Sequence, residues 1–356
     1  MSQSLATSFF VTALALLDAV SPKAFSAYEM LRAQSQFEVR GIYWTAYTAG
    51  YENRRKQLIR LVENSELNAV VIDVKDASGK VFFDTKSPLV KEVGSEDLER
   101  MPDIEETLQE LRQKNIYTIA RIVVFQDPIL TEKFPEVALK SKNGGIWKNW
   151  RGIAWADTSS KFVWKYNVEI AKEAIRLGFD EVNFDYIRFP SDGPLGDIIY
   201  PYYSEQKAGK NEVVADFFKY VRANLKYYPA FVSVDLFGMT MLRGDGLSIG
   251  QRYQDAADYV DYISPMVYPS HYPDGFRGYD NPADYPYEIV YTSLDNARHF
   301  LKNRRAKIRP WLQDFDLGAI YDTEKIHAQQ RATDDAGGVG WMMWNASNNY
   351  TEIAYK

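Results

Sequence analysis

The chain has no cysteine and only three histidines among its 356 residues. Without cysteine it can form no disulfide, has no thiol nucleophile and cannot carry a lipid-modified cysteine anchor. The histidines, His271, His299 and His327, are scattered along the chain, and no HExxH pattern is present. These absences argue against a histidine-based zinc site.

An excess of positive charge is also missing. The net charge is −6 and the sequence pI is near 5.4. Proteins that bind nucleic acid usually present a basic face to the phosphates, so we expect no nucleic-acid partner. No required metal or other cofactor is predicted.

The chain has no apolar run long enough to span a bilayer, but residues 1–37 hold a shorter one. Phe9 to Val20 has the length of a signal-peptide core, and Ala24-Phe25-Ser26 offers a small-x-small cleavage site. No Lys or Arg precedes the run. We therefore expect an imperfect export signal followed by a short helix, and a periplasmic or extracellular protein. The alternative is a packed N-terminal helix on a cytoplasmic protein.

Aromatic residues are abundant, at 15% of the chain with 25 Tyr and 8 Trp. Hydrophobic content of 46% with 25% charged residues is ordinary for a soluble globular protein. Part of the aromatic content belongs in the core. The surplus beside loops suits a ligand with flat apolar faces, such as a sugar ring.

Eight short runs rich in β-branched and aromatic residues alternate with amphipathic helical patterns, which predicts an α/β fold of the (β/α)8 TIM-barrel type over residues 38–356. An open doubly wound sheet would normally carry a Gly-rich phosphate loop, and none follows the first run. Only 12 residues follow Trp344, so we expect the eighth helix to be short or missing. The predicted strands are Val39–Trp44, Ala69–Val74, Tyr117–Phe125, Glu181–Phe189, Phe231–Phe237, Tyr262–Tyr268, Lys307–Gln313 and Val339–Trp344.

Two insertions interrupt this alternation, Asp127–Asp157 after the third strand and Ser191–Asn211 after the fourth. Long insertions on the catalytic side of a barrel commonly form substrate walls.

The carboxyl ends of barrel strands converge on one mouth, where enzymes of this fold keep their chemistry. Several of these strand ends carry a carboxylate, among aromatic and amide side chains. The predicted mouth residues are Trp44, Asp73, Lys75, Asp76, Arg121, Gln126, Asp127, Asp185, Arg188, Asp235, Tyr268, His271, Gln313, Asp314, Trp344 and Asn345.

Asp185 and Asp235 are the predicted catalytic pair. Glycoside hydrolysis needs one protonated group to donate to the leaving oxygen and one ionised group to attack the sugar. Adjacent strands run about 5 Å apart, close to the roughly 5–5.5 Å separation of a retaining mechanism. We assign Asp185 as the nucleophile and Asp235 as the acid/base, with Arg121 placed to pair with Asp185.

Structural roles compete with each of these assignments. Asp185 could simply pair with a buried arginine, and Asp235 could cap a turn. A salt-bridge cluster is the alternative for Asp73, Lys75 and Asp76. The remaining alternatives are a surface position for His271 and packing within the insertion for Trp147 and Trp150.

Six segments of the chain together resemble a bacterial family described as putative glycosyl hydrolases, a domain of unknown function in the TIM-barrel glycosidase group. These segments are Gly41-Ile42-Tyr43-Trp44, Ile72-Asp73-Val74-Lys75-Asp76, Phe184 to Pro190, Ile263 to Tyr272, Arg309 to Gln313 and Gly340 to Asn345. The resemblance covers nearly the whole barrel and implies the (β/α)8 fold and a role in carbohydrate breakdown. The Asp at the end of strand four also looks like the nucleophile of α-amylase-type enzymes. Those enzymes carry Glu at strand five where this chain has Asp235, which leaves the acid/base identity open.

The sequence therefore predicts a glycoside hydrolase that acts on an oligo- or polysaccharide. Two other hypotheses stay open. One is a metal-dependent barrel hydrolase in which Asp73, Asp76, Asp185 and Asp235 hold a hard cation such as Mg²⁺. The other is a barrel that binds carbohydrate without catalysis.

Overall fold

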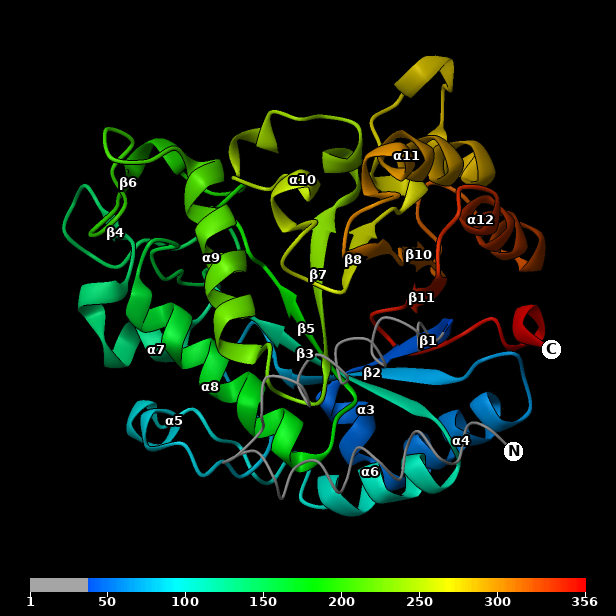
Figure 1. Cartoon of the computed structure of the whole chain (residues 1–356), viewed down its shortest axis with the longest axis horizontal. Helices are drawn as coiled ribbons and strands as arrows, with labels where there is room; N and C mark the ends of the chain where they lie inside the picture. Colours follow the sequence, from blue (N-terminus) through cyan, green and yellow to red (C-terminus); the bar gives the residue numbers. More distant parts are fainter. Residues whose placement is uncertain (1–37) are drawn as a thin grey trace.

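The computed structural model of the chain describes residues 38–356. In chain order its barrel strands are β1 (Val39–Trp44), β2 (Ala69–Lys75), β3 (Tyr117–Val123), β5 (Glu181–Asp185), β7 (Phe231–Phe237), β8 (Tyr262–Met266), the interrupted pair β9 (Lys307–Ile308) and β10 (Trp311–Gln313), and β11 (Gly340–Trp344). Neighbours pair in parallel in the order β10-β11-β1-β2-β3-β5-β7-β8-β9, and a further pairing of β10 with β8 closes the sheet. The predicted (β/α)8 barrel is confirmed (Figure 1).

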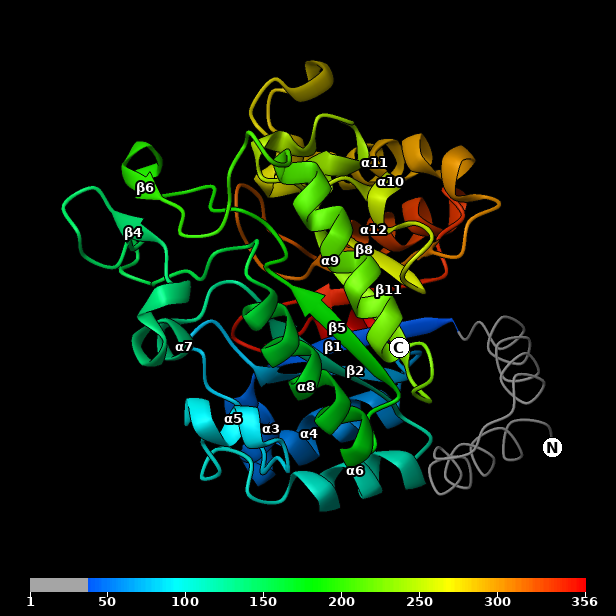
Figure 2. The same ribbon diagram turned by 60° about the vertical axis from the view of Figure 1, so that its left-hand side comes forward.

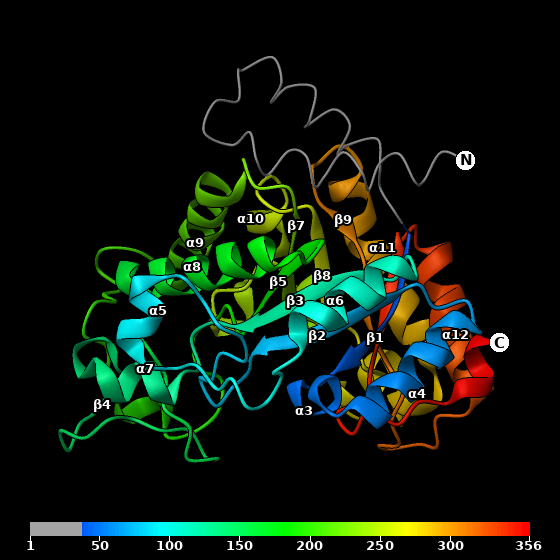
Figure 3. The same cartoon turned by 90° about the horizontal axis from the view of Figure 1, so that it is seen from below.

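Helices surround the barrel (Figures 1 and 3). They are α3 (Ala46–Gly50), α4 (Glu52–Glu63), α5 (Pro88–Val93), α6 (Ile104–Gln113), α7 (Pro128–Lys133), α8 (Lys161–Leu177), α9 (Lys210–Leu225), α10 (Tyr253–Ala256), α11 (Pro286–Leu301) and α12 (Thr323–Asp335). Helix α8 shows how the sequence sets their ends. Ser160 accepts a hydrogen bond from the Val163 N–H at its start, and Gly178 ends it in the left-handed region.

The structure has no α-helix in residues 345–356, which follow β11, so the expectation of a short or missing eighth helix is confirmed for this stretch. After β11 the chain forms only the 3₁₀ turn Glu352–Tyr355, whose buried Ala354 and Tyr355 pack against the barrel. The export signal and short helix expected in residues 1–37 lie outside the described residues. No helix among residues 38–356 has the length and apolar character needed to cross a membrane.

Alternation along the strands divides the buried apolar side chains into two groups. Ile42, Val70 and Ile72 face outward and pack with the helices in the large core. Their neighbours in the chain, such as Tyr43 and Val71, face the barrel interior. The interior group is small, and polar and charged side chains fill the rest of the lumen.

Three predicted strands end earlier than expected, and the seventh is interrupted. The fourth strand stops at Asp185 because Tyr186 adopts a left-handed φ of 54°. The seventh breaks between β9 and β10, at Arg309-Pro310, because proline has no N–H for the ladder.

The two insertions form one lobe beside the barrel. Strand β4 (Lys140–Ser141) of the first pairs antiparallel with β6 (Ile198–Ile199) of the second, at the edge of the molecule in Figure 2. Trp147 is buried and donates from its indole N–H to the Pro194 carbonyl, whereas Trp150 is 76% exposed. Packing of the insertion is therefore the role that the structure gives Trp147.

Candidate active site

Three carboxylates converge on one guanidinium at the mouth of the barrel. Arg121 lies beside Asp73 in the β2–β3 register, and its Nη1 donates to Asp73 Oδ1 at 2.6 Å. Its Nη2 donates to Asp185 Oδ2, and its Nε lies 3.8 Å from Asp235 Oδ2. All four side chains are buried. One arginine therefore faces three acids, and this buried group cannot hold all its carboxylates ionised at low cost.

Asp185 is held through both carboxylate oxygens. Besides the bond from Arg121, the Tyr186 backbone N–H donates to Oδ1 at 2.5 Å. The left-handed φ of Tyr186 is unfavourable for a non-glycine residue, by about 1–3 kcal/mol. This backbone conformation turns the chain away from the sheet at the point where Asp185 reaches the mouth.

Asp235 lies level with Asp185 on the adjacent strand, because Phe184 pairs with Val234 one residue earlier. Its Oδ1 accepts bonds from Asn183 Nδ2 at 2.9 Å and from Trp311 Nε1 at 2.8 Å. Its Oδ2 accepts no hydrogen bond from residues 38–356. These bonds come from side chains on β5 and β10, so the alternative role as a turn cap does not apply to the Asp235 side chain.

The environment of Asp235 favours a proton on it. Burial raises the pKa of Asp235 well above its usual range, and the charge of Asp185 raises it further. Arg121 and the two hydrogen bonds offset this only in part. Burial also raises the pKa of Asp73, against the lowering effect of Arg121.

Aromatic rings enclose the cluster. Tyr43 donates its hydroxyl to Asp73 and stacks on Trp344, with ring centroids 4.1 Å apart and planes 19° apart. Trp311 meets Trp344 edge-on at 5.5 Å. On the other side Tyr268 contacts His271 at 5.1 Å and Phe315 at 5.8 Å. The structure thus brings Trp344, Tyr268 and His271 to the mouth, as predicted from the sequence.

Three predicted mouth residues, Trp44, Lys75 and Asp127, lie elsewhere. Trp44 is fully buried in the outer core, so it cannot stack on a ligand at the mouth, and Tyr43 occupies that position instead. Lys75 is fully buried in an ion pair with Asp127, at 2.8 Å, and donates to the Val123 carbonyl at 2.5 Å. A shift of register between Asp73 and Lys75 accompanies this change of direction. Substrate contact by Lys75 is not supported by this placement.

Asp76, Gln313, Asp314 and Asn345 are engaged in local structure. Asp76 accepts from the Ser78 backbone N–H at 2.9 Å within a turn. Asp314 accepts from Thr351 and from the Tyr355 hydroxyl at 2.6 Å, which fastens the C-terminal turn. Gln313 and Asn345 bond neighbouring loops through Ser270, Phe315 and Asn349.

Within residues 38–356, the grouping of the acids gives no support to the metal hypothesis. No group of three or more His, Asp or Glu side chains within residues 38–356 has the arrangement of metal ligands. The Arg121 guanidinium lies between Asp73 and Asp185, where a cation shared by these carboxylates would bind. Asp76 bonds its own turn instead.

Three residues of the site were not singled out as mouth residues from the sequence, namely Tyr43, Asn183 and Trp311. Each bonds one of the acids from inside the barrel. The sequence did hold a signal for two of them, because alternate residues of a strand face the same side. Tyr43 therefore faces the same side as Val39, and Asn183 faces the same side as Asp185.

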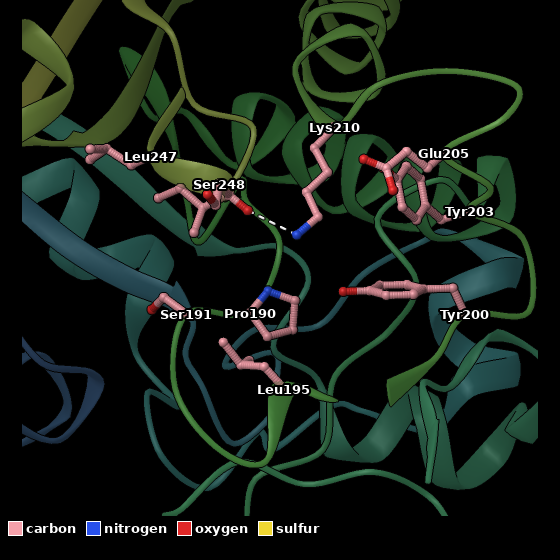
Figure 4. A pocket seen from close by; sticks show the side chains of 10 residues that line it. Pro190, Ser191, Leu195, Tyr200, Tyr203, Glu205, Lys210, Leu247 and Ser248 are labelled. Carbon is pink, nitrogen blue, oxygen red and sulfur yellow. Dashed lines mark hydrogen bonds between the residues drawn. The ribbon is translucent and has the colours of Figure 1, made fainter. Parts of the chain in front are cut away.

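A cavity of about 540 Å³ lies beside the mouth and is lined by Pro190, Ser191, Leu195, Tyr200, Tyr203, Glu205, Lys210, Leu247, Ser248 and Ile249 (Figure 4). Its lining begins at Pro190, two residues after Arg188 in the loop that follows the strand end at Asp185. Asp185 and Asp235 themselves are 4% and 1% exposed.

Comparison with solved structures supports the fold. A hypothetical protein from Ruminiclostridium thermocellum is 36% identical over 55% of this chain and 96% of its own, with a TM-score of 0.50. The glycoside hydrolase domain of PgaB (BpsB) from Bordetella bronchiseptica has a TM-score of 0.62 at 16% identity, over 89% of this chain and 95% of its own. An endo-beta-1,4-mannanase from Thermotoga petrophila has a TM-score of 0.53 at 12% identity, over 87% of this chain and 68% of its own.

No curated protein matches the chain. The family described as the putative glycosyl hydrolase domain matches residues 41–350, which include all of the barrel except the first two residues of β1, and every mouth residue discussed above. The chain belongs to this putative glycosyl hydrolase family.

Proposed function

We propose that the protein hydrolyses O-glycosidic bonds of an oligo- or polysaccharide with Asp185 and Asp235. The observation that carries the proposal is the three-acid cluster around Arg121, which contains one carboxylate held by two hydrogen bonds and another whose pKa is strongly raised. Glycosidases need two carboxyl groups in these two states. Family membership supports the class of reaction.

Asp235 is the proposed acid. Its Oδ1 is occupied by Asn183 and Trp311, so the proton resides on Oδ2, which has no hydrogen-bond donor among the described side chains. From there it passes to the glycosidic oxygen as the bond from that oxygen to the anomeric carbon breaks. The leaving sugar departs as an alcohol.

Asp185 is the proposed nucleophile. Its carboxylate attacks the anomeric carbon as the leaving group departs and forms a glycosyl ester. Water then attacks the same carbon, Asp235 takes the proton of that water, and the ester bond breaks to release the sugar with its configuration retained. Positions on adjacent strands, about 5 Å apart, support this retaining course.

Two other functions are less well supported. A metal-dependent hydrolase would need a cation where the Arg121 guanidinium already contacts Asp73 and Asp185. Activity that disappears on exhaustive chelation and returns with Mg²⁺ would favour it. A binding protein without catalysis would have no use for an acid whose pKa is raised beside a second carboxylate.

Export is a further proposal, with residues 1–37 as a separate N-terminal segment. N-terminal sequencing of the mature protein tests it. A start near Ser26 or Ala27 is expected, and an intact Met1 or Ser2 would refute cleavage.

A panel of chromogenic glycosides and bacterial cell-wall polysaccharides tests the main proposal. We expect at least one substrate to be hydrolysed by the native protein and not by Asp185→Asn. Equal turnover by both proteins would contradict the catalytic assignment and favour the binding protein.

A further inference from the structure

Arg188 differs from the other buried basic residues of the barrel. Each of the others has a carboxylate partner, in the pairs Arg55–Asp103, Lys75–Asp127, Arg121–Asp73 and Arg309–Glu181. Arg188 is 6% exposed, and no carboxylate among residues 38–356 lies within ion-pair distance of it. Burial of an unpaired charge is costly, so a buried arginine normally has an anion beside it.

The surroundings of Arg188 leave donors free toward a ligand. Its Nη1 donates to the Phe189 carbonyl at 3.2 Å and to Ser191 Oγ at 3.0 Å. The rings of Trp155, Tyr186 and Phe237 lie 4.8–5.2 Å from its guanidinium carbon. Nε and Nη2 donate to no acceptor in the described part of the chain, and neither is a sealed, unsatisfied atom.

A second cation lies in the adjoining cavity. Figure 4 shows the Lys210 amine pointing into the space between Ser248, Pro190 and Tyr200. It donates to the Ser248 carbonyl at 2.9 Å, and no carboxylate of residues 38–356 lies within ion-pair distance. Glu205, which is exposed, is the acid of the cavity lining. Burial lowers the pKa of Lys210, and the charge of Glu205 opposes this.

The cavity is joined to the reaction centre. Ser191, which accepts from Arg188, also lines the cavity. The Phe189 N–H donates to the Ile249 carbonyl at 2.9 Å. Gln251 donates to the carbonyls of Ile187 and Asp235, both at 3.4 Å. The cavity wall is therefore fastened to the two strands that carry the catalytic acids.

We propose that the substrate is an acidic glycan, whose anionic substituent pairs with Arg188 beside the scissile bond while a neighbouring sugar lies in the Lys210 cavity. The proposal rests on the proposed hydrolase function and names its substrate class. Tyr200 and Tyr203, whose centroids are 5.1 Å apart, provide ring faces for that sugar. A carboxylate, sulfate or phosphate ester would suit the guanidinium equally.

Binding calorimetry on Asp185→Asn, which removes turnover, tests the proposal. The probes are oligogalacturonate, a sulfated galactan oligosaccharide and a neutral galactan oligosaccharide of equal length. At least one acidic probe should bind about tenfold or more tightly than the neutral one, and this preference should fall as salt rises. The acidic probe that binds more tightly shows whether the site prefers a carboxylate or a sulfate ester.

Variants locate the effect. Adding Arg188→Gln should reduce the preference to near unity, while Arg188→Lys should keep part of it. Lys210→Gln should weaken the acidic probe, and Lys207→Gln, an exposed lysine outside the lining, should leave it unchanged. Thermal unfolding tests whether each variant is folded. If Arg188→Gln does not fold, the affinity of Lys210→Gln for the acidic probe decides the result.

Equal affinity for all three probes, or a preference that survives both Arg188→Gln and Lys210→Gln, would overturn the proposal. Tight acidic binding without hydrolysis of any probe by the native protein would instead count against the hydrolase function. The two failures are therefore distinguishable.

Discussion

Two of the buried arginines of the barrel, Arg121 and Arg309, have contrasting partners. At the mouth, Arg121 faces Asp73, Asp185 and Asp235. At the opposite end, Arg309 pairs with Glu181, its one ion-pair partner among residues 38–356, and both side chains are fully buried. Glu181 also accepts from Ser233 at 2.5 Å and from Tyr117 at 3.0 Å.

The difference is one of charge balance. At the end opposite the mouth, one positive charge pairs with one negative charge, and hydrogen bonds occupy the remaining acceptor positions of the Glu181 carboxylate. Such a balanced pair is a structural arrangement. At the mouth, burial and then the charge of Asp185 raise the pKa of Asp235. Its Oδ2 accepts no hydrogen bond from residues 38–356, whereas Oδ1 accepts two. An uneven cluster of this kind is suited to proton transfer.

Asp185→Asn should have the largest effect, and it acts on activity alone. Loss of the nucleophile should lower kcat by on the order of 10⁴-fold or more. The thermal midpoint should change little, because the amide can keep the bond from the Tyr186 N–H. Hydrolysis assays paired with thermal unfolding measure both; activity within tenfold of the native protein would contradict the assignment.

Glu181→Gln should show the opposite behaviour. It leaves Arg309 as an uncompensated buried charge, which costs about 3–5 kcal/mol of folding stability. Urea unfolding measures that loss. The folded fraction should keep its kcat, and the second change Arg309→Met should recover part of the stability. A specific loss of kcat without destabilisation would contradict the comparison.

Asp235→Asn should raise stability at neutral pH while lowering activity. A group whose folded pKa is raised contributes stability below its unfolded pKa and loses it as pH rises through the folded pKa. As pH rises, the free energy of unfolding of the variant should therefore increase relative to that of the native protein. The increase is roughly 1.4 kcal/mol for each pH unit that separates the unfolded pKa of Asp235 from its folded pKa. Unfolding of both proteins at pH 4 and pH 8 tests this. A stability advantage of the variant that is smaller at pH 8 than at pH 4 would refute it.

Tyr43→Phe should have the smallest effect. It removes the hydroxyl that donates to Asp73, at a cost of about 1 kcal/mol, and keeps the stack on Trp344. We expect kcat/KM to fall several-fold. Trp44→Phe, in the outer core, is the control and should change stability rather than kcat/KM.

The sequence was sufficient for the fold and for the central acids. Continuous apolar runs place the strands, and helical patterns between them give the barrel order, so Asp185 at a strand end and its contact with Arg121 followed. These features depend on local pattern and on the pairing of neighbouring strands.

What the sequence could not provide depends on side-chain direction. Trp44 and Tyr43 exchange roles because one residue of parity moves a side chain from the mouth to the outer core. Lys75 points away from the mouth because the strand register shifts between Asp73 and Lys75, and no residue type in the sequence predicts this shift. The lack of a carboxylate partner for Arg188 among residues 38–356 and the pairing of the two insertions also depend on contacts between distant segments.

The pH dependence of kcat/KM, compared between the native protein and Asp235→Asn, tests the central claim most directly. We expect native activity to fall at high pH, as the raised pKa of Asp235 is passed and the acid loses its proton, and this fall to be absent in the variant. A variant that keeps both the native rate and the same alkaline fall would contradict the account.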